Sequence, residues 1–195
     1  MLNYPYSHGD LLQEPQTYRY TPFQGEAFVD AWRASRLAAC NALPPPALPA
    51  LAATMAFSPT DSSALLSDLC QTMRTTPTAL LWSGEDTPVG YWLPRLLKKF
   101  EVSKRLYGAY EPTVPHRPVI DSGFGQMQAY LLLAECLIHG WRERKAGYFL
   151  NALLKLTDTL VSQQTRLDLQ QGAHLAWILA AEQELVTALS KELGQ

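Results

Sequence analysis

Cysteine is scarce in this sequence, and its distribution excludes two kinds of small cross-linked protein. Only three cysteines occur among 195 residues, Cys40, Cys70 and Cys136. The count is odd, no CxxC pair occurs and the three lie far apart, which argues against a secreted disulfide scaffold and against a cysteine-rich zinc site. We therefore expect buried thiols in a reducing cytosol.

Long apolar runs and an excess of one charge are also missing. No stretch reaches 18 uninterrupted apolar residues, because Glu135, Lys155 and Glu182 interrupt the longest ones. Residues 1–10 lack the basic start and apolar stretch of a signal peptide. With 16 basic and 18 acidic residues, the net charge is −2 and gives no electrostatic reason to expect nucleic acid. We predict a cytoplasmic protein that binds neither a membrane nor nucleic acid.

Known catalytic and cofactor motifs are not found. The sequence has no HExxH, no GxSxG and no paired aspartate motif. Gly84 and Gly90 are spaced six apart with two acids between them, and the following segment, 101–107, favours a helix over the second strand of a nucleotide-binding unit. The sequence thus predicts no cofactor and no metal.

Apolar residues, in contrast, are plentiful enough for a core. They make up 47% of the chain, and a chain of this length buries roughly 70% of its unfolded surface without help from a disulfide or metal. Residues 1–24 are rich in tyrosine and proline and show no period, so we expect an irregular N-terminal arm that lies across the domain or orders on a partner. Residues 25–195 are predicted to form one helical domain.

Helical spacing of apolar residues dominates that domain and predicts an all-α, or nearly all-α, bundle of about six helices. Expected helices run from Gly25 to the prolines at 44–46, from Leu48 to Phe57, from Thr60 or Asp61 to Arg74, from Leu93 to Tyr107, from Asp121 or Ser122 to Glu143, from Lys145 or Ala146 to Ser162, and from Leu169 or Gln170 to Leu193. The last three are long and closely connected, so they should pack as antiparallel neighbours. Residues 78–82 fit a buried strand or an apolar turn, and the sequence alone leaves both open.

Two polar pairs in the last third are the candidate site residues. Glu135 and His139 are four apart on one predicted helix, so a carboxylate can orient an imidazole there for general base work or metal ligation. Lys155 and Asp158 lie on a polar stripe of the next helix and would complete a catalytic or anchoring site if the two stripes face each other. The competing interpretation is two structural or surface pairs. Di-iron bundles use Glu-x-x-His twice, and this chain lacks that pattern.

Two functional classes follow from these features. The leading hypothesis is a non-catalytic helical interaction, accessory or regulatory module that binds a protein partner or a second copy of itself, because apolar helices are abundant and catalytic motifs are not. The alternative is a small enzyme or a protein that binds a small molecule, with a polar pocket between the C-terminal helices formed by Glu135, His139, Lys155 and Asp158.

Overall fold

The computed structural model describes residues 26–51, 62–76, 89, 93, 95, 96, 127–144 and 147–193. Five α-helices and one short 3-10 helix have defined bounds within these ranges, residues 89, 93, 95 and 96 are also helical, and no described residue lies in a strand. The elements are α2 (Glu26–Asn41), α3 (Ser62–Thr75), α6 (Met127–Arg144), α7 (Gly147–Ser162), η2 (Gln164–Arg166) and α8 (Leu169–Leu193). The mostly helical fold is thereby confirmed.

Several sequence predictions fall on parts of the chain outside the described residues. These are the N-terminal arm at 1–24, the strand or turn at 78–82, and most of the predicted helix at 93–107, of which residues 93, 95 and 96 are helical. The predicted total of about six helices therefore stays a prediction. The observed ends of α3, α7 and α8 lie within about two residues of the predicted ones, and α6 ends one residue after its predicted end, while the residues expected to begin α6 lie outside the described ranges. Helix α2 ends at Asn41, three residues before the first of the prolines predicted to end it.

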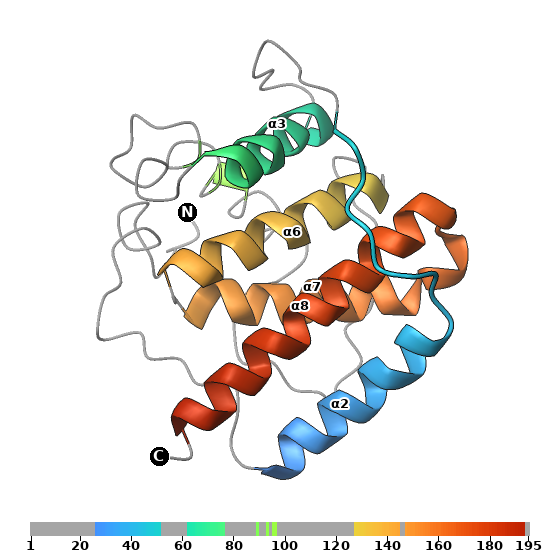
Figure 1. Ribbon diagram of the computed structural model, residues 1–195, viewed down its shortest axis with the longest axis vertical. Helices are drawn as coiled ribbons and strands as arrows, with labels where there is room; N and C mark the ends of the chain where they lie inside the picture. Colours follow the sequence, from blue (N-terminus) through green and yellow to red (C-terminus); the bar gives the residue numbers. More distant parts are fainter. Residues whose placement is uncertain are drawn as a thin grey trace, which may run out of the picture.

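Helix α6 is the centre of the bundle. It packs against α3, α7 and α8, whereas α2 packs on α8 at the opposite side of the molecule from α3 (Figure 1). The chain reverses direction between α6 and α7 and again between α7 and α8. Every residue from 129 to 138 is buried, and a helix that is apolar all round needs neighbours on several sides. The sequence of α6 therefore explains its central place.

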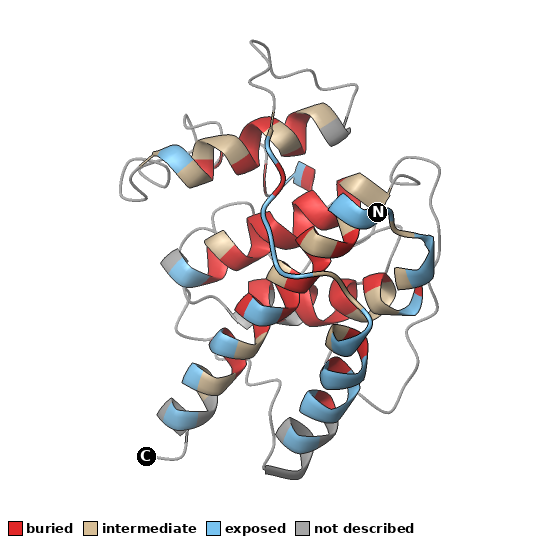
Figure 2. Ribbon diagram, turned by 45° about the vertical axis from the view of Figure 1, so that its right-hand side comes forward, coloured by how far each residue is buried: buried red, intermediate tan, exposed pale blue. Residues whose placement is uncertain are grey.

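The core follows the apolar stripes of the surrounding helices. Figure 2 shows the buried residues concentrated on α6 and on the faces that α7, α8 and α3 turn toward it, with exposed residues along the outer sides of α2 and α8. The large side chains with at most 1% of their surface exposed include Trp32, Tyr130, Phe149, Leu66 and Leu69. Burying a side chain of this size contributes about 1.5–3 kcal/mol.

An extended segment, residues 43–51, crosses the N-terminal part of α8 and leads from α2 toward α3; we call it the strap (Figure 1). The Ala47 amide donates to the Ala173 carbonyl oxygen at 3.1 Å. A Cβ built on Gly172 would lie 3.0 Å from Cδ of Pro44, so any other residue here would push the strap outward by a few tenths of an ångström. The helix predicted to begin at Leu48 is not present up to Leu51, because four prolines in 44–49 remove amide donors and favour extended backbone.

The start of α8 is fixed by a reciprocal capping box. The Gln171 amide donates to Asp168 Oδ1 at 2.8 Å, and the Asp168 amide donates to Gln171 Oε1 at 3.2 Å. Each contact satisfies a backbone donor that the first turn of a helix leaves without a partner.

We expect Asp168→Ala to lower the free energy of unfolding by about 1 kcal/mol, because the side-chain acceptor at the N-cap is lost. Urea unfolding followed by circular dichroism measures the change. Asp168→Asn is the matched control, since its amide oxygen accepts the same hydrogen bond and its loss should be only a few tenths of a kcal/mol. Equal losses in both variants would mean that the cap contributes nothing specific.

Candidate functional site

Two clusters of buried charged side chains tie the helices together. The first, which we call the Glu135 network, is centred on a carboxylate of α6 whose side chain is fully buried. Arg74 of α3 binds it with two parallel contacts, Nε to Oε1 at 2.6 Å and a terminal nitrogen to Oε2 at 2.8 Å. His174 of α8 donates through Nε2 to Oε2 at 2.8 Å. His139, one turn further along α6, places Nε2 at 3.4 Å from Oε1.

The Glu135 network holds its carboxylate in the ionised form. Burial by itself raises the pKa of Glu135, but the contacts from His139, His174 and Arg74 favour the charged form more strongly, so the pKa lies well below its ordinary value. Arg74 also donates to the Pro49 carbonyl oxygen at 2.8 Å. The network therefore connects α3, α6, α8 and the strap around one negative charge.

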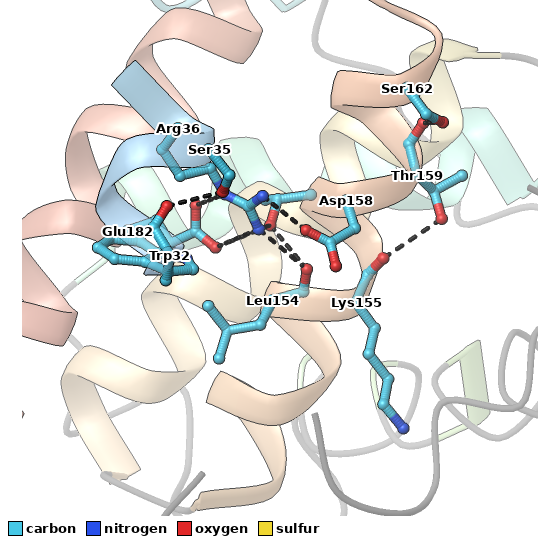
Figure 3. A network of polar contacts seen from close by, with 10 residues as sticks. Trp32, Ser35, Arg36, Leu154, Lys155, Asp158, Thr159, Ser162 and Glu182 are labelled. Atoms are coloured by element: carbon cyan, nitrogen blue, oxygen red, sulfur yellow. Dashed lines mark hydrogen bonds and ion pairs between the residues drawn. The ribbon is translucent and has the colours of Figure 1, made fainter. Parts of the chain in front are cut away.

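The second cluster, the Arg36 network, joins α2, α7 and α8 (Figure 3). The guanidinium of Arg36 is 2% exposed although arginine is rarely buried to this degree. Its partners are Asp158 Oδ1 at 2.5 Å, Glu182 Oε2 at 3.1 Å, Thr157 Oγ1 at 3.0 Å and the Leu154 carbonyl oxygen at 3.3 Å. Arg36 is the donor in all four contacts, so two carboxylates and two neutral oxygens compensate its positive charge.

Glu182 is the most buried acid of the Arg36 network. Burial raises the pKa of Glu182 above its ordinary value, and the opposing contacts from Arg36 and Thr157 do not fully offset it. The Thr157 hydroxyl donates to Glu182 Oε1 at 2.7 Å, and Trp32 stacks with its ring centroid 5.9 Å from the Arg36 guanidinium carbon. The network is thus a cation held between two acids and an indole.

Of the four site residues predicted from the sequence, two belong to the Glu135 network and one to the Arg36 network. Glu135 and His139 lie together, as the spacing of four predicts. Asp158 lies against Arg36. Lys155 is 5% exposed, and its side chain points away from the Arg36 guanidinium in Figure 3. Helical spacing placed Glu135 beside His139, but the partner of Asp158 comes from a helix more than a hundred residues earlier in the chain.

Sequence reasoning missed four residues of the two networks, namely Arg36, Arg74, His174 and Glu182. A signal existed for two of them. Arg36 falls at the spacing of the apolar stripe that contains Trp32 and Ala39, and Glu182 interrupts an apolar segment. A charged residue on a buried stripe requires a buried partner of opposite charge. Arg74 and His174 stand near helix ends, where charged side chains are ordinary, so nothing marked them.

His139 is the member of the Glu135 network that approaches the surface. Its side chain is 19% exposed, and its ring centroid lies 6.2 Å from that of Trp177 on α8. The guanidinium of Arg142 lies over the same indole at 5.9 Å and also contacts Glu184 at 3.4 Å. An imidazole and a cation of α6 therefore both lie beside one indole of α8.

Among the described residues, histidine, cysteine and acidic side chains form no group of three or more arranged to hold a metal ion. None of the described helices combines the length and the apolar character needed to cross a bilayer. Comparison of the chain with protein-family models, with curated protein sequences and with solved structures finds no match.

Proposed function

We propose that this chain is a helical interaction module that associates through its strap, and that the first partner is a second copy of the chain. The proposal rests on apolar side chains that are exposed on the strap and on the first turn of α8. Leu169, in the first turn of α8, is 78% exposed, and Leu48 in the strap is 38% exposed. Pro45 and Pro46 are exposed beside them. We call these four residues the strap surface.

A backbone hydrogen bond brings the strap close to the first turns of α8. Ala47, next to Leu48, bonds to Ala173, and Ala173 lies one turn after Leu169 on the same face of α8. The nine residues of the strap carry no charged side chain. Since the whole chain carries only −2, repulsion between two copies is weak, and a neutral apolar surface is complementary to itself.

The buried charged residues of the two networks support a structural role, because they bind one another across helices. Arg36 binds two carboxylates from other helices and Arg74 binds one, and these contacts hold α2 and α3 to the bundle. Groups engaged in this way maintain the shape that presents the strap. A rigid, extended segment also loses little conformational entropy on binding, which favours association.

The test is the molar mass of the full chain, measured by light scattering and sedimentation over a wide range of concentrations. We expect a reversible dimer, and we expect the double variant Leu48→Asp/Leu169→Asp to weaken the dimer by at least about tenfold, because two apolar contacts of about 1 kcal/mol each are replaced by charges. Leu37→Asp is the matched control: Leu37 is 60% exposed on α2, outside the strap surface, and its change should leave the dimer intact.

A wild-type chain that stays monomeric at the highest concentration reached would contradict the proposal, as would equal weakening by the control and the double variant. Because all three leucines are exposed, circular dichroism should show unchanged folding in every variant.

A second function has one specific observation in its favour, the partly exposed His139, whose Nε2 lies 3.4 Å from the buried carboxylate of Glu135. Such an imidazole is suited to general base work or to binding an acid, and Trp177 and Arg142 beside it fit an aromatic carboxylate. Titration with benzoate, followed by NMR of the histidine and indole signals, tests this alternative. Saturable shifts that disappear in Arg142→Gln would support it, and no shift at millimolar benzoate would exclude this ligand class.

A further inference from the structure

Two of the three cysteines meet at the interface between α3 and α6. The Sγ atoms of Cys70 and Cys136 lie 3.4 Å apart, although 66 positions separate them in the chain. Both are free thiols, and both side chains are fully buried. Cys70 also lies 3.3 Å from the Leu132 carbonyl oxygen, to which its thiol donates. Cys40, the third cysteine, is only half-buried and lies on α2.

The geometry points to a modification site: we propose that Cys70 and Cys136 form a dithiol that a hydroperoxide converts to a disulfide, which fastens α3 to α6. The sulfur atoms already touch at van der Waals distance. A disulfide bond of about 2.05 Å requires them to approach by about 1.4 Å, which is within reach of side-chain rotation and a small shift of one helix.

The reaction balances with one molecule of peroxide. One thiolate attacks a peroxide oxygen, the O–O bond breaks, and sulfenic acid and water (or an alcohol) form. The second thiol then attacks the sulfenic sulfur, the S–S bond forms and water leaves. Two thiols are oxidised, losing two hydrogen atoms in all, and the peroxide is reduced. Burial raises the pKa of the Cys70 thiol well above its usual value, so the thiolate is scarce and the first step is slow.

The cross-link would act on the helix that anchors the strap. Helix α3 packs directly on α6. Arg74, one turn after Cys70, binds both Glu135 and the Pro49 carbonyl oxygen. A covalent bond between Cys70 and Cys136 would therefore fix the position of Arg74 over Glu135 and hold the end of the strap.

The test uses the full chain with Cys40→Ser, so that Cys70 and Cys136 are the two cysteines that remain. After treatment with hydrogen peroxide, we expect the intact mass to fall by two hydrogen atoms, both thiols to resist alkylation under denaturing conditions, and a cross-linked Cys70–Cys136 peptide to appear on digestion. The melting temperature should rise by about 5–10 °C, because a long loop is closed in the unfolded chain. Dithiothreitol should reverse every change.

The matched control is Cys40→Ser/Cys136→Ala, in which peroxide should add oxygen to Cys70 or leave it unchanged, with no rise in melting temperature. The wild-type chain gives the same readouts without any substitution at a buried position, so a control that fails to fold does not remove the test. The proposal is overturned if both thiols stay alkylatable, if each becomes a sulfinic acid without a cross-link, or if wild-type Cys40 takes the place of either cysteine in the disulfide.

Discussion

Replacing Arg36 with methionine should lower the free energy of unfolding by about 3–5 kcal/mol. The guanidinium is the common partner of Asp158 and Glu182. Methionine fills much of the same volume, yet it leaves a fully buried Glu182 carboxylate without its cation. An uncompensated buried charge costs far more than the lost contact itself.

Arg33 provides the control for this experiment. It lies one turn earlier on α2, is exposed, and contacts Thr187 at 3.4 Å. Arg33→Met should change stability by less than about 0.5 kcal/mol, as is usual for surface positions. The double variant Arg36→Met/Glu182→Gln should recover part of the loss, because the orphaned carboxylate is removed. Chemical unfolding at neutral pH measures all three, and similar losses at positions 33 and 36 would contradict the role assigned to the Arg36 network.

Glu135→Gln should lower the free energy of unfolding by about 3 kcal/mol at neutral pH. The amide keeps the shape of the side chain but removes the charge that Arg74 and His174 bind. Arg74 retains some access to water and its bond to the strap, so the expected loss lies at the lower end of the range for broken buried pairs. Glu184→Gln is the control, because Glu184 is 75% exposed and contacts only the surface cation Arg142 among the contacts described.

The stabilising effect of Glu135 should disappear in acid. The folded-state pKa of Glu135 lies below its unfolded value of about 4.3, so the unfolded chain binds a proton first as the pH falls. The stabilisation is therefore complete above the unfolded pKa and is lost as the pH falls toward the folded one. The difference in unfolding free energy between wild type and Glu135→Gln should be constant near neutrality and shrink below about pH 4.

Glu182 should behave in the opposite sense, which makes Glu182→Gln a sharp comparison. Because burial raises the pKa of Glu182, the folded chain binds the proton of this carboxyl group more tightly than the unfolded chain does, and the stability linked to that proton is lost as the pH rises through the folded pKa. We expect Glu182→Gln to cost less than Glu135→Gln at neutral pH. A larger cost for Glu182→Gln, or a Glu135→Gln difference that grows in acid, would contradict this assignment of charges.

Local sequence determined the helices. The apolar spacing of three and four residues, the prolines at 44–46 and the polar starts before α3 and α8 act within a few residues of one another, so they can be evaluated without knowing the fold. The same holds for Glu135 and His139, because a helix fixes neighbours at i and i+4. The helix predicted to begin at Leu48 is absent from Leu48 to Leu51, and the reason is again local. The neighbouring prolines favour extended backbone more strongly than the apolar residues favour a helix.

Only the tertiary structure decided which charges meet. Arg36 reaches Glu182 across 146 positions, Arg74 reaches Glu135 across 61, and Cys70 reaches Cys136 across 66. Helical periodicity says which face of a helix is buried, but it does not say which other helix covers that face. Those pairings depend on how α3 and α8 cross α6 and how α2 lies on α8, and that packing is set by the shapes of all the apolar faces together.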